Sequence, residues 1–272
     1  MILFGKPKNP ADVIYHAISL LEKNQPKAAV ALFNQALKAD PKNIEALYNK
    51  GLALNKIKKY QDAITSFDKV LEINPEDAPA LNNRAIAMSE SGNPEDAIEY
   101  YDKSIEADSK YAAAHYNKGV LLDKLGKQDE ALECLDEAIK LDPKNSSSRF
   151  YKGVVLGKLN RHEEALNCFS NICNTHPQHM DAFFHKGIEM AELDKHKQAI
   201  EIFDKILKNH KNNVNVIYAK SRSKAALDEI DESLSLLKQA ISGNPKVIKK
   251  WAKQEKVFER LQDDEKFKKI IR

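Results

Sequence analysis

The sequence predicts an all-α fold in which short helical hairpins stack one behind another. A pattern of small and bulky residues repeats every 34 residues, without an insertion, from about residue 10 to residue 247. Within each repeat the apolar residues have helical spacing, which is broken once by a short polar turn. A single hairpin of this kind cannot bury its apolar face alone, so successive hairpins must stack.

Small residues mark the first helix of every repeat. They recur at Ala17, Gly51, Ala85, Gly119, Gly153, Gly187 and Ser221. Because glycine inside a helix costs about 1 kcal/mol relative to alanine, the four glycines need a compensating role. We expect the backbones of the two paired helices to approach each other closely at these positions.

The second helix of every repeat has its own series of small residues. They are Ala29, Ala63, Ala97, Ala131, Ala165, Ala199 and Ser233. Four positions later comes a bulky residue: Phe33, Phe67, Tyr101, Leu135, Phe169, Phe203 and Leu237. Pro26 and Pro94 open two of these helices, and the polar residue before each proline is expected to cap the helix.

Pairs of acidic residues also recur with the period of the repeat. They are Glu95-Asp96, Asp129-Glu130, Glu163-Glu164 and Asp231-Glu232. This spacing places each pair in the first turn of a second helix, where negative charge interacts favourably with the helix dipole. The pairs therefore indicate helix starts and not acid–base catalysis.

Proline closes five of the repeats, at Pro41, Pro75, Pro143, Pro177 and Pro245. With the two series of small residues and the bulky series, this pattern resembles the tetratricopeptide repeat family. The resemblance implies a right-handed superhelix of helix pairs, with the first helices lining a concave face. It covers about nine-tenths of the chain and implies fold more strongly than function.

The period divides the chain into an N-terminal extension, residues 1–9, seven repeats and a C-terminal cap. The repeats are 10–43, 44–77, 78–111, 112–145, 146–179, 180–213 and 214–247, and residues 248–272 form the cap. In the cap, Glu255 stands at the position of the small residue, so the tight helix contact is not expected to continue there. We expect Trp251, Phe258 and Leu261 to face inward and the lysines to face outward.

Charge is distributed unevenly along the chain. The net charge is +3, but residues 245–272 carry +5 and residues 1–9 carry +2, which leaves −4 on residues 10–244. A solenoid that binds RNA would carry positive charge along its body, so nucleic acid is not the expected partner. The basic C-terminal end is either a solvated capping helix or a contact site for an acidic partner, RNA or a membrane surface.

The residues that carry chemistry in other proteins form no recognisable site here. The chain has no nucleotide-binding glycine loop, no nucleophile elbow and no metal-binding His-Glu-x-x-His helix, so we predict no enzyme activity and no cofactor. Cys173, His176, His179 and His185 lie close in sequence, but their spacing matches no zinc signature and we predict no metal site. The three cysteines form no disulfide framework, and no apolar run is long enough for a signal peptide or a membrane span. A cytoplasmic location is therefore expected.

The resemblance places a partner in the groove lined by the first helices. Asn49, Asn83 and Asn117 lie two residues before the small position in successive repeats. In the family, asparagines at this position bind the backbone of an extended peptide, since an amide both donates and accepts hydrogen bonds. Local hydrogen bonding within the fold is the alternative. In later repeats the same position holds Tyr151 and His185, which divides the groove into two zones and makes pH-dependent binding at His185 an open alternative.

An aliphatic series follows the small position by one residue. The members expected to contact a peptide are Leu52, Ile86, Val120, Val154 and Ile188; Ile18 precedes them and Arg222 ends the series. Contiguous exposed apolar surface usually marks an interaction site, so an extended or helical peptide with apolar side chains is the expected partner. The basic residues of a two-carboxylate clamp for chaperone tails are absent, because Ile14, Glu45, Tyr48, Pro79 and Asn82 stand at its positions.

These observations favour a scaffold or adaptor that binds a peptide segment of another protein. Self-association into a dimer, through the first repeat or the aliphatic series, is the alternative. RNA binding is the third alternative, against which the acidic body argues.

Overall fold

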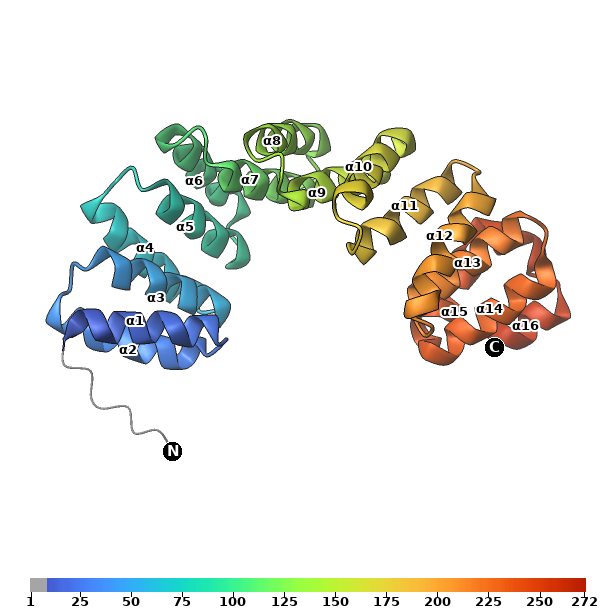
Figure 1. Cartoon of the computed structure of the whole chain (residues 1–272), viewed down its shortest axis with the longest axis horizontal. Helices are drawn as coiled ribbons and strands as arrows, with labels where there is room; N and C mark the ends of the chain where they lie inside the picture. Colours follow the sequence, from blue (N-terminus) through green and yellow to red (C-terminus); the bar gives the residue numbers. More distant parts are fainter. Residues whose placement is uncertain (1–8) are drawn as a thin grey trace. The chain divides into compact units, whose positions relative to one another are not determined.

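The computed structural model describes residues 9–272, and every regular element in this range is a helix (Figure 1). The chain divides into two compact units, Met1–Asn145 and Ser146–Arg272. The predicted extension, with Lys6 and Lys8, lies outside the described residues except for its last residue, Asn9. None of the helices within 9–272 combines the length and the apolar character needed to cross a bilayer.

Four helical hairpins make up the described part of the first unit. Their helices are α1 Pro10–Glu22, α2 Pro26–Ala39, α3 Ile44–Lys56, α4 Tyr60–Ile73, α5 Ala78–Glu90, α6 Pro94–Ala107, α7 Ala112–Lys124 and α8 Gln128–Leu141. Each first helix has 13 residues and each second helix has 14.

Three hairpins and a terminal segment make up the second unit. The helices are α9 Ser146–Lys158, α10 His162–Thr175, α11 Met180–Glu192, α12 His196–Asn209, α13 Val214–Ala226, α14 Ile230–Gly243, α15 Pro245–Gln254, the 3₁₀ helix η1 Lys256–Leu261 and α16 Glu265–Ile271. The predicted stack of helical hairpins is confirmed in both units.

The two helices of a hairpin pack against each other, and within each unit a second helix also packs against the first helix that follows it. Within the first unit, α1 contacts α3, α3 contacts α5, and α5 contacts α7. Contacts between successive second helices are sparser. The first helices of this unit therefore form one continuous inner layer, on which the predicted asparagines and the aliphatic residues Leu52, Ile86 and Val120 lie.

At two of the glycines, the space left by the missing side chain is filled by an aromatic ring from the partner helix. A Cβ atom on Gly51 would lie 2.6 Å from Phe67 Cε1, and one on Gly187 would lie 2.5 Å from Phe203 Cε1. Both rings are fully buried, so the bulky residue of each second helix fills the space above the glycine. The nearest atoms of the partner helix at these positions thus belong to a ring, which the sequence pattern did not predict. At Gly119 a Cβ would meet the backbone oxygen of Ala131 at 3.1 Å.

The last hairpin replaces both small residues with serine. The Ser221 hydroxyl donates to the backbone oxygen of Ser233, and the Ser233 hydroxyl donates to the backbone oxygen of Ser221, both at 2.9 Å. The two side chains are fully buried. This reciprocal pair of hydrogen bonds joins α13 to α14 at the positions equivalent to Gly51 and Ala63 of the second hairpin, and it satisfies both buried hydroxyls.

The turn inside each hairpin contains one residue in the left-handed region of backbone space. These residues recur every 34 positions: Asn24, Lys58, Gly92, Gly126, Asn160, Asp194 and Asp228. Six of the seven are Asn, Asp or Gly, the types that adopt positive φ at least cost. This series explains why the turn has the same length in every repeat.

Helix capping differs between the two helices of a hairpin. The side chains of Asn9, Asn43, Asp77, His179 and Asn213 cap first helices by accepting from a backbone N–H three residues later. The polar residues before Pro26 and Pro94, which are Gln25 and Asn93, make no such hydrogen bond. That part of the prediction is wrong, because their backbone adopts a turn conformation that follows the left-handed residue. The acidic pairs do lie in the first turns of α6, α8, α10 and α14 as predicted.

The C-terminal segment covers the core of the last hairpin. Phe258 and Phe267 are fully buried with ring centroids 5.7 Å apart, and Leu261 is buried beside them. Trp251, predicted to face inward, is 40% exposed, so that prediction is wrong. The Trp251 ring lies along the edge of the core with its centroid 5.6 Å from that of Tyr218, while Phe258 of η1 lies 6.4 Å from the same ring and is fully buried.

Candidate functional site

The three predicted asparagines occupy the same position on α3, α5 and α7, the inner layer of the first unit. Their amide nitrogens are all hydrogen-bonded within the protein. Asn49 Nδ2 donates to the backbone oxygen of Glu45 at 2.9 Å. Asn83 Nδ2 donates to the backbone oxygen of Pro79 at 2.8 Å and to the hydroxyl of Tyr48 at 3.0 Å. These bonds fix the amides of Asn49 and Asn83 in orientation.

Asn117 donates through Nδ2 to Asn82 Oδ1 at 2.9 Å. Asn82 is only 3% exposed and occupies a position that holds an aromatic residue, such as Tyr48 or Tyr116, in neighbouring repeats. The Asn117 amide therefore donates to the buried oxygen of Asn82, and leaving that oxygen without a donor would destabilise the fold. The local hydrogen bonds predicted as the alternative do form, and the amide oxygens are the atoms left to accept from a ligand.

Tyr48 links the asparagine position to the core of the second repeat. Its ring packs edge-on against Phe67 with centroids 5.9 Å apart, while its hydroxyl accepts from Asn83. Burial, aided by the charges of Tyr111 and Asp77, raises the pKa of Tyr48 to about 12. The hydroxyl is therefore protonated at neutral pH and has its own proton to donate.

The aliphatic series lies partly inside the fold. Leu52 packs against the core around Leu47 and Phe67, and Ile86 packs against Ala85 and Tyr101. These two side chains and that of Val120 are half-buried. The series therefore presents the edges of aliphatic side chains along the inner layer of the first unit, and not a fully exposed apolar strip.

In the second unit, Val154, Tyr151 and Ile188 are also half-buried. His185 is surrounded by aromatic rings, with centroid distances of 5.2 Å to Phe150 and 5.1 Å to Phe169. Burial lowers the pKa of His185, against a weaker opposing effect of the Asp181 charge. The imidazole is thus neutral at neutral pH and packs as an aromatic residue, as histidines in apolar surroundings do.

No cluster of metal-ligating residues occurs among residues 9–272. The four residues considered in the sequence have separate roles. His179 caps α11 and stacks on Phe150, His185 packs among rings, and Cys173 is buried with a raised pKa caused by burial. His176 follows the end of α10 and is exposed.

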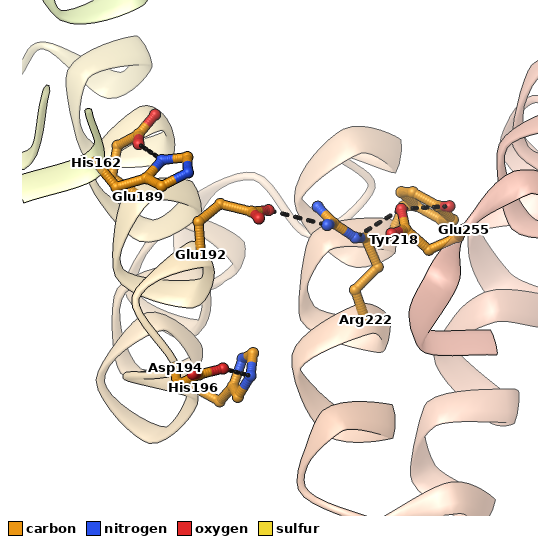
Figure 2. Close-up of polar contacts among 8 residues, drawn as sticks. All are labelled: His162, Glu189, Glu192, Asp194, His196, Tyr218, Arg222 and Glu255. Carbon is orange, nitrogen blue, oxygen red and sulfur yellow. Dashed lines mark hydrogen bonds and ion pairs between the residues drawn. The ribbon is translucent and has the colours of Figure 1, made fainter. Parts of the chain in front are cut away.

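An ion-pair network around Arg222 was not predicted (Figure 2). Arg222 Nη2 lies 3.0 Å from Glu192 Oε1 of α11, and Arg222 Nε lies 2.8 Å from Glu255 Oε2, at the end of α15. The network connects the sixth repeat, the seventh repeat and the cap within the second unit. The signal in the sequence was the replacement of an aliphatic residue by arginine at the end of the series.

A second unpredicted pair joins α10 to α11. Glu189 is 5% exposed, and its Oε2 atom lies 2.8 Å from Nδ1 of His162 (Figure 2). Burial raises the pKa of Glu189, while the hydrogen bond to His162 opposes the shift. The position of Glu189 holds Ala53, Ala87, Leu121 and Val155 in other repeats, and this break in an apolar series was the available signal.

A cavity of about 670 Å³ lies between α11, α13 and η1 in the second unit. Its walls carry both signs of charge, including Arg222, Glu255 and Arg260. Three buried side-chain atoms in its lining, Ser223 Oγ, His196 Nδ1 and Arg222 Nε, make no hydrogen bond within residues 9–272, although Arg222 Nε lies in the ion pair with Glu255. The cavity is polar and can hold water or a small polar group.

The fold and the inner layer of polar and aliphatic side chains define a helical-hairpin repeat protein. Tetratricopeptide repeat profiles match residues 16–78, 54–116, 112–145 and 134–167, which together cover more than half of the chain. The chain belongs to the tetratricopeptide repeat family. Proteins of this family are built as protein-interaction scaffolds.

Solved structures of the same fold agree with this assignment. A tetratricopeptide repeat protein from Parabacteroides merdae matches with a TM-score of 0.63 and 20% identity, over 90% of this chain and 97% of that one. The type IV pilus biogenesis factor PilW matches with a TM-score of 0.68 and 20% identity, over 78% and 98% of the two chains. YrrB, described as a repeat protein with an unusual peptide-binding site, matches with a TM-score of 0.60 and 25% identity, over 69% and 97%. No protein with a curated description matches the sequence.

Proposed function

We propose that this protein is a non-enzymatic scaffold that binds a peptide segment of another protein along the inner layer of first helices. The observation that carries the proposal is the repetition of oriented amides beside aliphatic side chains on α3, α5 and α7. The amide oxygens of Asn49 and Asn83 accept from backbone N–H groups of an extended segment, while Leu52 and Ile86 contact its side chains. The likeness to YrrB, whose description names a peptide-binding site, supports the proposal.

The hydrogen bonds within the fold decide which variants test this proposal. Asn117 is retained, because its removal would leave the buried Asn82 oxygen without its donor. Asn49 bonds only to its own helix, and Asn83 bonds to its own helix and to the half-buried Tyr48. The double variant Asn49→Ala, Asn83→Ala therefore removes the proposed contacts with a small structural effect.

The matched control removes two asparagines from second helices, Asn171→Ala and Asn209→Ala, both at exposed positions. Proteins recovered from native lysate are identified for wild type, double variant and control, and a peptide from each recovered protein is titrated by fluorescence anisotropy. We expect a partner that the wild type and the control bind and that the double variant loses. Equal peptide affinities for the double variant and the wild type would contradict the proposal.

Self-association is the second candidate function, and the first helix supplies the observation that favours it. Tyr15 is 78% exposed on α1, next to a cavity of about 540 Å³ lined by Ile14 and Ile18. An exposed aromatic ring beside a cavity with a partly apolar wall suits a contact with a second copy. Light scattering over a concentration series tests this candidate: a dimer that Tyr15→Ser abolishes supports it, and a monomer at all concentrations refutes it.

A further inference from the structure

One type of ion pair recurs where a second helix meets the following first helix. Arg84 Nε lies 2.6 Å from Asp68 Oδ1, and Lys118 Nζ lies 2.5 Å from Asp102 Oδ1. In the second unit, Lys220 and Asp204 form the same pair at 2.5 Å. In every case the acid precedes the cation by 16 residues, and the cation is about four-fifths buried or more. The fold therefore has a standard place for a carboxylate on this cation.

The contact between α2 and α3 lacks that carboxylate. Lys50 stands at the cation position, but 16 residues earlier the chain has Asn34. Within residues 9–272, Lys50 has no ion pair, and the side chain of Asn34 makes no hydrogen bond. Burial and the neighbouring charge of Lys69 lower the pKa of Lys50, with Asp62 opposing them. The half-buried ammonium is thus left without the counter-charge that Arg84, Lys118 and Lys220 have.

Asn34 and Lys50 line a cavity of about 400 Å³ between α2, α3 and α4. Two further lysines, Lys59 and Lys69, also line it, against a single acid, Asp62, whose carboxylate lies 3.7 Å from Lys59. The rest of the wall is largely apolar and includes Val30, Leu37, Pro41, Leu47 and Leu54. The cavity combines an excess of positive charge with aliphatic surface.

We propose that this cavity is a binding site for an organic carboxylate that carries a short apolar portion. The carboxylate takes the place on Lys50 that Asp68 and Asp102 occupy on Arg84 and Lys118, and the apolar portion lies against the aliphatic wall. Carboxylate is favoured over phosphate because the fold itself pairs this position with carboxylates. The site lies on α2, α3 and α4 and does not depend on the peptide-binding proposal.

The strongest test supplies the missing carboxylate from within the chain. In the full-length variant Asn34→Asp, the new side chain should pair with Lys50 as its equivalents do and exclude the ligand. Lys50→Gln should lose the ligand for the opposite reason, because the cation is gone. Asn34→Ala is the control, since it changes the same residue without adding a charge and should retain binding.

Binding is followed by ¹H–¹⁵N NMR at Lys50 and Asn34, with hexanoate, an acetylated Leu-Glu-Leu amide peptide and inorganic phosphate as separate probes. We expect hexanoate to bind the wild type and Asn34→Ala, with affinity about tenfold lower in Asn34→Asp and in Lys50→Gln, the loss expected for one charge-assisted hydrogen bond. The peptide arm tells whether the carboxylate of a protein side chain also enters the cavity, or only a free acid.

The chain offers a further control at Lys186, which is preceded 16 residues earlier by Ser170 and also lacks an ion pair within residues 9–272. Lys186→Gln should leave hexanoate binding at Lys50 unchanged. Equal affinity of wild type and Asn34→Asp would overturn the proposal, as would an equal loss in Lys186→Gln. Tighter binding of phosphate than of hexanoate would overturn the assignment to a carboxylate.

Discussion

Arg222→Leu would restore the aliphatic residue that six preceding repeats have at this position, yet we expect it to destabilise the end of the chain. The guanidinium lies 3.0 Å from Glu192 and 2.8 Å from Glu255. The side chains of Arg222 and Glu255 are 26% and 22% exposed, while that of Glu192 is 37% exposed. Leucine would leave the mostly buried carboxylate of Glu255 without its cation.

The expected loss follows from these exposures. The outer pair with Glu192 contributes at most about 1 kcal/mol, as exposed ion pairs do. Loss of the inner cation costs about 1–3 kcal/mol, the range for leaving a mostly buried polar group without its partner. Burial of the leucine side chain offsets about 1 kcal/mol of this loss in stability. The net loss of stability is about 2 kcal/mol. It should lower the free energy of local unfolding of residues 245–272 and leave the rest of the chain unchanged.

Hydrogen exchange measures this loss where it occurs. Amides of α15, η1 and α16 should exchange about 30-fold faster in Arg222→Leu, the ratio that about 2 kcal/mol implies, while amides of 9–145 keep their rates. Glu192→Gln should raise exchange of the cap only slightly. The double variant Arg222→Leu, Glu255→Gln should recover more than half of the loss, because it removes the unpaired charge. Unchanged exchange of the cap in Arg222→Leu would refute the reasoning.

Three further predictions concern the packing of the second unit. Gly187→Ala should lower the free energy of unfolding by about 1–2 kcal/mol in chemical denaturation, since the new methyl group would overlap the buried Phe203 ring by more than the gain in helix propensity offsets. Ser221→Ala and Ser233→Ala should each cost about 1 kcal/mol, because each hydroxyl donates to the other residue's backbone oxygen. The two hydroxyls also lie 3.3 Å apart, so the two losses should not be additive; a double variant whose loss equals the sum of the single losses would contradict this. Burial raises the pKa of Glu189, so the folded state holds the proton of this carboxyl to higher pH than the unfolded state does. The wild type should therefore lose stability relative to Glu189→Gln as pH rises from about 4 through the folded-state pKa. Chemical denaturation at pH 4 to 7 measures the difference in unfolding free energy, and a difference that does not change with pH would contradict the assignment.

The hairpin stack could be predicted from sequence because the information is local and is repeated. Gly51 and Phe67 lie in one hairpin, and the same spacing recurs in six other repeats. Seven copies of the same short-range pattern therefore support one assignment of the helices. The acidic pairs were assigned correctly for the same reason, since their meaning depends only on their place in one helix.

The proposed binding residues could be placed on the first helices from the sequence, but their hydrogen-bond partners within the fold could not be predicted. Asn83 bonds to Tyr48, and Asn117 bonds to Asn82, each 35 residues away in the chain. Such contacts depend on how one repeat rotates against the next. The partial exposure of Trp251 likewise depends on how the C-terminal segment packs against the last hairpin.

The sequence by itself determined the class of fold, the length and order of the helices and the side of each hairpin that is buried, because helical periodicity and the 34-residue period are properties of the chain alone. Only the tertiary structure decided which charges are paired. Lys50 and Lys118 look alike in sequence, but one faces Asn34 across a cavity and the other faces Asp102 at 2.5 Å. The difference arises between helices, where the free energy of a charge depends on the groups that packing brings to it.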